Sequence, residues 1–169
     1  MANKLNNCYL INAPAGSGKT TEIKSIVQRC IIDNPKDNIL CITYTNRAAD
    51  ELSKGILSKN VFIGTIHSFL HFFLKPYFAH QDILELYFEI YGAQISERID
   101  NKSQKESIAE SNARYIEKYG KLDYDMVRNN IKVLSYNESP FSSLYYGGLS
   151  HDDLIGFSKA IFNRYPVIK

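Results

Sequence analysis

Short apolar runs alternate with amphipathic stretches along the first 65 residues. Residues 8–13, 39–44 and 61–65 are apolar and rich in β-branched residues, which predicts three strands. Between them, over 19–33 and 46–56, apolar positions recur every three to four residues, which predicts two helices that each bury one face. The order strand, helix, strand, helix, strand with short links is typical of a parallel sheet covered by helices on both faces. This part of the chain is therefore expected to have an α/β fold.

The ends of these two helices can be read from the residues around them. Asn34-Pro35 is expected to stop the first helix, and Thr45 or Asn46 is expected to cap the second. The buried face of the first helix is predicted to consist of Ile23, Ile26, Val27, Cys30 and Ile31.

Beyond His67 the pattern is helical as far as about Tyr136. We expect breaks near Lys75-Pro76, Gly92 and Gly120, and the polar stretch 96–118 is predicted to be a solvated helix or a connection. Serine, proline and glycine make 135–149 loop-like.

A last helix is predicted to begin near Ser150, with Ser150 or Asp152 as its cap, and to end before Pro166. Asp152 and Asp153 are interpreted as acids that stabilise this helix start, in preference to catalytic carboxylates. The resulting division is a first core segment 1–70, an inserted helical subdomain 71–148 and a helix 149–169 that returns to the core.

Composition narrows the class of protein. The chain has 169 residues, 44% of them hydrophobic, which fits one globular domain with a small subdomain. Its net charge is only +2, and residues 61–169 hold twelve Lys and Arg against thirteen Asp and Glu, so no global basic field indicates nucleic acid. No apolar run is long enough to span a membrane, and the N-terminus has no secretory pattern. Cys8, Cys30 and Cys41 are interpreted as buried free thiols of a cytoplasmic protein.

The strongest chemical signal is a glycine-rich segment between the first strand and the first helix. It reads Ala13-Pro14-Ala15-Gly16-Ser17-Gly18-Lys19-Thr20, followed by Thr21, and fits the pattern [AG]xxxxGK[ST]. Two glycines permit positive φ, so that successive N–H groups can surround phosphate oxygens at a helix start. Lys19 is predicted to reach the β- and γ-phosphates, and the hydroxyl of Thr20 to ligate Mg²⁺. We interpret the segment as a site for a nucleoside triphosphate, with Lys19 and Thr20 as its catalytic residues.

A second group of polar residues follows the second and third strands. Tyr44 ends an apolar strand, at the edge where α/β sheets present ligands, and an aromatic ring there can stack on a nucleobase. Thr45, Asn46 and Arg47 begin the next helix and can bind phosphodiester oxygens. The alternative is that Thr45 and Asn46 only cap the helix while Tyr44 packs.

Two further patterns are given structural interpretations. His67 and His71 have the spacing of a helical metal pair, but no acidic or third ligand stands nearby, so a zinc site is not favoured. An aromatic cluster at helical spacing is expected to be core; its members are Phe69, Phe72, Phe73, Tyr77, Phe78, Tyr87, Phe88 and Tyr91.

Three motifs together resemble the UvrD/Rep-like superfamily 1 DNA helicases. The glycine-rich loop 15–20 is similar to that family's Walker A loop, and the segment Ile39–Leu52 resembles its motif Ia, T-[FY]-T-N-[KR]-A-A-x-E-[ML] after an apolar strand. Residues 63–69, IGTIHSF, are similar to its next signature, and 149–154, LSHDDL, resemble the segment before its Walker B strand. The resemblance extends over almost the whole chain, with the helical lobe matched only by position and length.

The resemblance implies a RecA-like P-loop NTPase core interrupted by an inserted helical subdomain. It implies ATP and Mg²⁺ as cofactors, and single-stranded DNA or a duplex/single-strand junction as partner. By this likeness, Tyr44 to Arg47 contact single-stranded DNA, and Thr65 and His67 contact its backbone. ATP hydrolysis would drive translocation and unwinding in the complete protein.

Several expected parts are missing from the sequence. No apolar strand ends in Asp-Glu, no glutamine precedes the phosphate loop to read adenine, and Thr21 stands where close relatives often have Arg. We therefore expect an N-terminal piece of a helicase that ends before Walker B and lacks the C-terminal helicase domains. Such a piece should bind nucleotide weakly and not unwind DNA. The alternatives are an inactive nucleotide- and DNA-binding remnant and a small P-loop nucleoside or nucleotide kinase.

Overall fold

The computed structural model describes residues 2–5, 8–12, 14, 16–102, 105–136 and 144–168, with only the backbone for 2–5 and 8–11. The chain divides into two compact units, Met1–Phe69 and Leu70–Lys169. Strands and two amphipathic helices make up the first unit, whereas the second is mainly helical. The predicted α/β character of the N-terminal part is confirmed.

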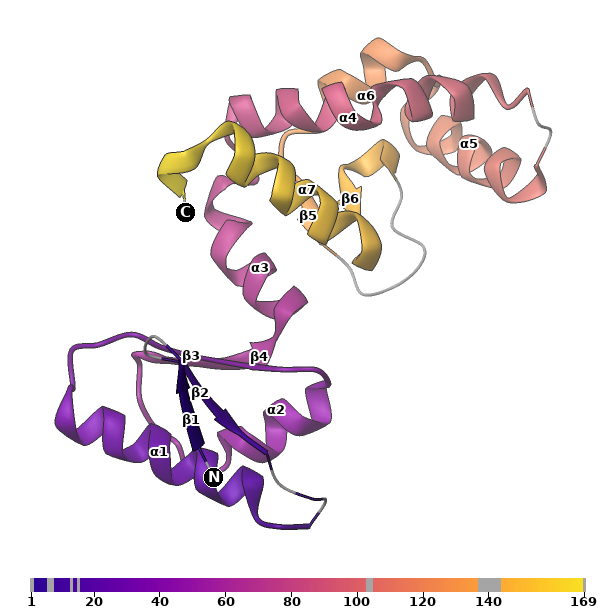
Figure 1. Ribbon diagram of the computed structural model, residues 1–169. Coiled ribbons are helices and arrows are strands. Elements are labelled where there is room, and N and C mark those ends of the chain that lie inside the picture. The colour runs from indigo at the N-terminus through magenta and orange to yellow at the C-terminus, as the bar shows by residue number, and fades with distance from the viewer. Residues whose placement is uncertain are drawn as a thin grey trace. The chain divides into compact units, whose positions relative to one another are not determined.

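The first unit contains four strands and two full helices. Its strands are β1 (Ala2–Leu5), β2 (Cys8–Ile11), β3 (Ile39–Thr43) and β4 (Val61–Thr65). Its helices are α1 (Lys19–Asp33) and α2 (Asn46–Ser53), and they lie on the same face of the β3–β4 pair (Figure 1). Helix α1 begins and ends where the sequence predicts, whereas α2 begins as predicted but ends at Ser53, before the predicted end at residue 56.

The strands of the first unit do not form the predicted single parallel sheet. β3 and β4 pair in parallel, with Thr43 opposite Thr65, but β2 pairs antiparallel with β1. Pairing strands that are close in sequence costs less loop-closure entropy than a long-range parallel pairing. Strand β1 was not predicted from the sequence, so the predicted neighbour of β2 is wrong.

Burial in the first unit is shallower than the periodicity predicts. Of the five apolar positions expected to be buried on α1, only Val27 is buried, while Ile23 and Cys30 are exposed. The prediction of a buried thiol is therefore wrong for Cys30, and Cys41 is half-buried. Partial burial raises the pKa of the Cys41 thiol, and the nearby Cys30 adds to this shift. The side chain of Cys8 lies outside the described residues.

Within its described residues the second unit has seven helical segments and two short strands, in addition to the last part of α3 (Ile66–Leu74). The longer helices are α4 (Gln81–Asp100), α5 (Glu106–Tyr119), α6 (Tyr124–Asn130) and α7 (His151–Arg164). Single 3₁₀ turns are η1 (Lys75–Tyr77), η2 (Leu144–Tyr146) and η3 (Pro166–Ile168). Strand β5 (Ser135–Tyr136) pairs in parallel with β6 (Gly148–Leu149).

Two details of this unit differ from the predictions. Gly92 does not break a helix; it lies within α4, where an added Cβ would come within 2.6 Å of the Tyr124 hydroxyl, so the glycine allows α6 to approach. The segment predicted as a loop carries β5, β6 and η2, and Gly147 provides the positive φ of 71° at the turn between η2 and β6. Residues 137–143 of that segment lie outside the description.

The core of the second unit is partly aromatic, and four of the eight side chains of the predicted cluster are buried. Phe78, Tyr87, Phe88 and Tyr91 are buried, but Phe72 is exposed. The hydroxyl of Tyr87 donates to the carbonyl of Leu144 at 2.8 Å, which satisfies a polar atom deep in the core. Burial raises the pKa of Tyr87.

Helix α7 packs within this unit and starts with a complete cap. The backbone N–H of Asp153 donates to the hydroxyl of Ser150, and the backbone N–H of Ser150 donates to the carboxylate of Asp153. Leu154, Phe157 and Ile161 of α7 are buried, and Arg164 pairs with Glu89 of α4. The predicted capping role of this acidic segment is confirmed, with Ser150 as the cap.

Acidification is expected to destabilise the second unit through His71. The ring of His71 lies 5.3 Å from that of Tyr136, and burial, followed by the charge of Lys75, lowers the pKa of His71. Because the folded state favours the neutral imidazole, the stabilisation is complete above the ordinary value of 6.5 and is lost as the pH falls through it towards the folded pKa.

Urea unfolding above and below pH 6.5 measures this effect, with His71→Phe as the comparison. The variant should lose less stability on acidification than the parent chain. Equal losses in both proteins would show that His71 does not contribute to the pH dependence.

Candidate functional site

Two glycines of the glycine-rich loop have the left-handed conformation that the motif predicts. Gly16 and Gly18 adopt positive φ values of 77° and 83°, a region that side-chain-bearing residues rarely enter. The Ser17 hydroxyl donates to the Pro14 carbonyl at 2.8 Å, which holds the turn closed. Alanine at either glycine would strain the turn, although the space around both positions is open.

Helix α1 starts directly behind this loop and keeps backbone donors available. Its N-cap is Gly18, which supplies no side-chain hydrogen bond to the first turn. The N–H groups at a helix start lack intrahelical partners, and together with the helix dipole they favour an anion. The N–H groups of the first turn of α1 therefore lie directly after the glycine-rich loop.

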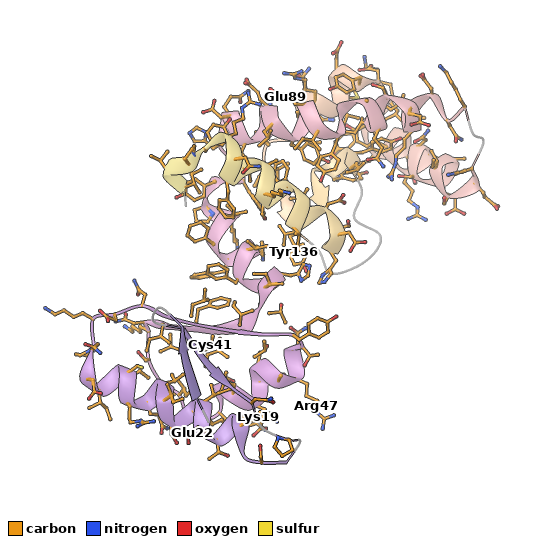
Figure 2. The ribbon with its side chains drawn as sticks, viewed as in Figure 1. Lys19, Glu22, Cys41, Arg47, Glu89 and Tyr136 are labelled. Atoms are coloured by element: carbon orange, nitrogen blue, oxygen red, sulfur yellow. The ribbon has the colours of Figure 1, made fainter. Side chains whose placement is uncertain are left out.

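The two side chains expected to act on the nucleotide lie at this helix start. Lys19 is exposed, and its Nζ donates to the Pro14 carbonyl at 2.6 Å, so the ammonium lies across the loop (Figure 2). Thr20 and Thr21 are exposed in the first turn. A hydroxyl at Thr20 and an ammonium at Lys19 are the groups that suit a phosphate chain with its Mg²⁺. Ala13 and Ala15 lie outside the described residues.

Tyr44 and the start of α2 form a second exposed group. Tyr44 follows β3 directly and is 99% exposed, so it does not pack as the structural alternative required. Thr45 is the N-cap of α2, and its hydroxyl accepts a hydrogen bond from the N–H of Ala48 at 3.2 Å. Asn46 and Arg47 are exposed in the first turn, and Figure 2 shows Arg47 extending outward from α2.

Thr65 and His67 lie at the same sheet edge as Tyr44. The register pairs Thr65 with Thr43, so the segments after β3 and β4 leave the sheet side by side. Thr65 is buried, and its hydroxyl accepts from the N–H of Ser68 and shares a hydrogen bond with the Ser68 hydroxyl. In this conformation the Thr65 hydroxyl is occupied with the start of α3, while His67 is half-buried.

Gly64 allows this close arrangement. An added Cβ at Gly64 would lie 2.5 Å from the Ser68 hydroxyl oxygen and 2.8 Å from the Phe62 ring. The glycine therefore lets the first turn of α3 fold back on β4, where Phe62 and Phe69 pack edge to face. This contact fixes where the segment after β4 leaves the sheet.

A protein-family model matches the part of the chain that contains the motifs of the candidate site. The model of the UvrD/REP helicase N-terminal domain matches residues 1–165. The chain belongs to the UvrD/REP helicase family. Comparison with curated proteins and with solved structures found no match. The resemblance predicted from three motifs is confirmed, and UvrD-family helicases use ATP and Mg²⁺.

The UvrD-like motif around α2 also contains an ion pair between helices that was not predicted from the sequence. Glu51 lies 3.6 Å from Nζ of Lys24 on α1 and 2.8 Å from Nζ of Lys54. A hydrogen bond from Lys54, aided by the charges of both lysines, lowers the pKa of Glu51. Glu51 thereby connects the helix of the phosphate loop to the helix that follows Tyr44. Lys24 carries no local signal for this role, because the pair forms only when the two helices pack.

Metal-ligand clusters and membrane-spanning helices were both looked for among the described residues of this UvrD-like chain. There, no three His, Cys, Asp or Glu side chains gather in a way that could hold a metal ion. None of the helices that the structure describes is long and apolar enough to cross a membrane.

Proposed function

We propose that this chain provides the first nucleotide-binding and DNA-binding elements of an ATP-dependent DNA helicase. The observation that carries the proposal is the start of α1, which has no side-chain cap and follows two glycines in the left-handed conformation. Family membership supports a helicase parent with ATP and DNA as ligands. The fold of the core is proposed to be of the RecA-like P-loop type.

The nucleotide is proposed to bind through residues 13–21. The N–H groups of the loop surround the phosphates, and Lys19 exchanges the Pro14 carbonyl for the β- and γ-phosphate oxygens. The Thr20 hydroxyl holds the metal ion. Mg²⁺ held there would neutralise the charge that develops during phosphoryl transfer.

Single-stranded DNA is proposed to bind along the edge where β3 and β4 end. The free ring of Tyr44 stacks on a base, while Asn46 and Arg47 contact phosphate oxygens. Thr45 caps α2 and still carries a hydroxyl proton to donate. Because the Thr65 hydroxyl is already bonded to Ser68, the contribution of 65–67 is proposed to come from backbone N–H groups and His67.

For the division of the chain into domains, we propose the ranges that the sequence predicts. Residues 1–70 are proposed to form the first part of the ATP-binding core, 71–148 the inserted helical subdomain, and 149–169 a return to the core. In the structure the last helix, α7, contacts α4 within the second unit. Translocation and unwinding are proposed for the complete parent protein.

Direct binding measurements with the full chain test the proposal. A fluorescent ATP analogue with Mg²⁺ and a labelled oligo(dT) should each give weak, saturable binding, and oligo(dT) affinity should fall as salt rises. Nucleotide binding without any DNA binding would remove the role of the Tyr44 segment. Absence of nucleotide binding would remove the role of the phosphate loop.

A further inference from the structure

The exposed ring of Tyr44 is carried by a backbone segment that the preceding residue holds in place. The hydroxyl of Thr43 donates to the carbonyl of Thr45 at 3.0 Å. Donor and acceptor lie on the two residues that flank Tyr44, so this hydrogen bond closes a turn around the tyrosine. Because the Tyr44 side chain is 99% exposed, packing contributes little to its orientation, and the direction of the ring depends on the backbone of this turn.

The same hydroxyl also contacts the neighbouring strand. Oγ1 of Thr43 lies 3.4 Å from the carbonyl oxygen of Gly64 on β4, and the register places Thr43 opposite Thr65. A hydroxyl has one proton to donate, so the two carbonyls share it and the shorter bond, to Thr45, is the stronger one. Thr43 is half-buried, which shields both contacts from part of the competing water. Thr43 therefore connects the segment that follows β3 to the end of β4.

On the other side of Tyr44, Thr45 is fixed by the start of α2. Its hydroxyl accepts a hydrogen bond from the N–H of Ala48 at 3.2 Å, and its carbonyl accepts one from the N–H of Ala49 at 3.1 Å. A carbonyl oxygen has two lone pairs, so it can accept from Ala49 and from Thr43 together. Tyr44 is thus a single residue between two anchored ones.

A fixed backbone matters for a ring that must stack. Ordering a flexible segment at the moment of binding lowers the affinity, because the conformational entropy is lost then. A turn that is already closed leaves mainly the side-chain torsions of Tyr44 to be ordered. The side chain of Thr45 already supplies the cap of α2, so the cap does not need the Thr43 hydroxyl. The contacts of that hydroxyl therefore act on the turn at Tyr44.

We propose that Thr43 is a positioning residue for Tyr44. Its hydroxyl holds the turn in the conformation in which the ring projects from the sheet edge and stacks on a base. Thr43 does not touch the DNA itself and acts through Tyr44. This inference rests on the proposed single-strand site and adds to it a residue that works through the hydrogen bonds described above.

Relaxation of ¹⁵N in the full chain without DNA tests whether Thr43 holds the turn. Thr43→Val keeps the shape of the side chain but has no donor, and Thr43→Ser keeps the donor. In Thr43→Val the order parameters of the Tyr44 and Thr45 amides should fall from about 0.85, typical of rigid backbone, towards the flexible range below about 0.6. Thr43→Ser should keep the values of the unchanged chain. Equal order parameters in Thr43→Val and the unchanged chain would overturn the proposal.

Anisotropy titration of a labelled oligo(dT) tests whether the turn affects binding. Thr43→Val should weaken binding by about three- to tenfold, the effect of losing one hydrogen bond, and Thr43→Ser should retain the affinity. Ser53→Ala is the matched control. It removes a comparable hydrogen bond at the other end of α2, from the Ser53 hydroxyl to the Asp50 carbonyl, and should leave the affinity unchanged.

A double-mutant cycle with Tyr44→Ala shows whether Thr43 acts through the ring. Once the ring is absent, Thr43→Val should cause no further loss of affinity. An equal loss in both backgrounds would mean that Thr43 acts independently of Tyr44, which contradicts the proposal. If the unchanged chain does not bind oligo(dT), the proposed function fails and the role of Thr43 in stacking fails with it. The relaxation measurement still shows separately whether the hydroxyl holds the turn.

Discussion

Replacing Lys19 with alanine is expected to abolish binding of ATP–Mg²⁺. Lys19 carries the positive side-chain charge of residues 13–21, and its removal leaves the negative charge of the β- and γ-phosphates without a side-chain cation at the helix start. The same change removes the 2.6 Å hydrogen bond to the Pro14 carbonyl. Titration of a fluorescent ATP analogue, in this chain and in the intact parent, measures the loss.

Two further variants separate charge from loop shape. Lys19→Met keeps the aliphatic stem but not the charge, so it should fail to bind as Lys19→Ala does. Lys36→Ala removes an exposed lysine of the same unit outside the loop and should bind like the unchanged chain. Unchanged ATP affinity in both Lys19 variants would mean that this loop is not the nucleotide site.

Features encoded by neighbouring residues could be predicted from the sequence. Asn34-Pro35 ends α1, Thr45 caps α2 and Ser150 caps α7, each as predicted, because capping depends on contacts within one turn. The glycine positions of the phosphate loop have the expected positive φ for the same reason. Local chemistry determines both the helix boundaries and the backbone shape of the candidate nucleotide site.

Features set by distant contacts could not be predicted. The antiparallel pairing of β2 with β1 depends on which strands meet, and Cys30 is exposed because little of the unit packs over that part of α1. A glycine inside an apolar helical pattern indicates a break as readily as a close approach, and only the packing of Tyr124 decides between them at Gly92.

The candidate DNA-binding segment combines features that neighbouring residues determine with features that packing determines. The position of Tyr44 at a strand end follows from the sequence, and its complete exposure agrees with a ligand role. The occupation of the Thr65 hydroxyl by Ser68 does not follow from it, since the hydrogen bond requires α3 to turn back over Gly64. The sequence motifs locate this edge of the β3–β4 pair, and the structure shows which hydroxyl groups along it already have a hydrogen-bond partner.

Replacing Tyr44 with alanine is expected to weaken binding of single-stranded DNA by about 1–3 kcal/mol, through loss of base stacking. The side chain is 99% exposed, so its removal should not change the stability of the unit. Anisotropy titration of a labelled oligo(dT) measures the affinity, and urea unfolding checks the stability.

Two matched variants decide whether stacking is the cause. Tyr44→Phe keeps the ring without the hydroxyl and should retain the affinity, whereas loss of affinity in this variant would assign the role to the hydroxyl. Leu57→Ala removes an equally exposed apolar side chain of the same unit, 98% exposed, and should have no effect. If Tyr44→Ala binds as tightly as the unchanged chain, the sheet edge holds DNA through Asn46, Arg47 and backbone N–H groups alone. Binding would then depend on phosphates, and its salt dependence would be as steep in the variant as in the unchanged chain.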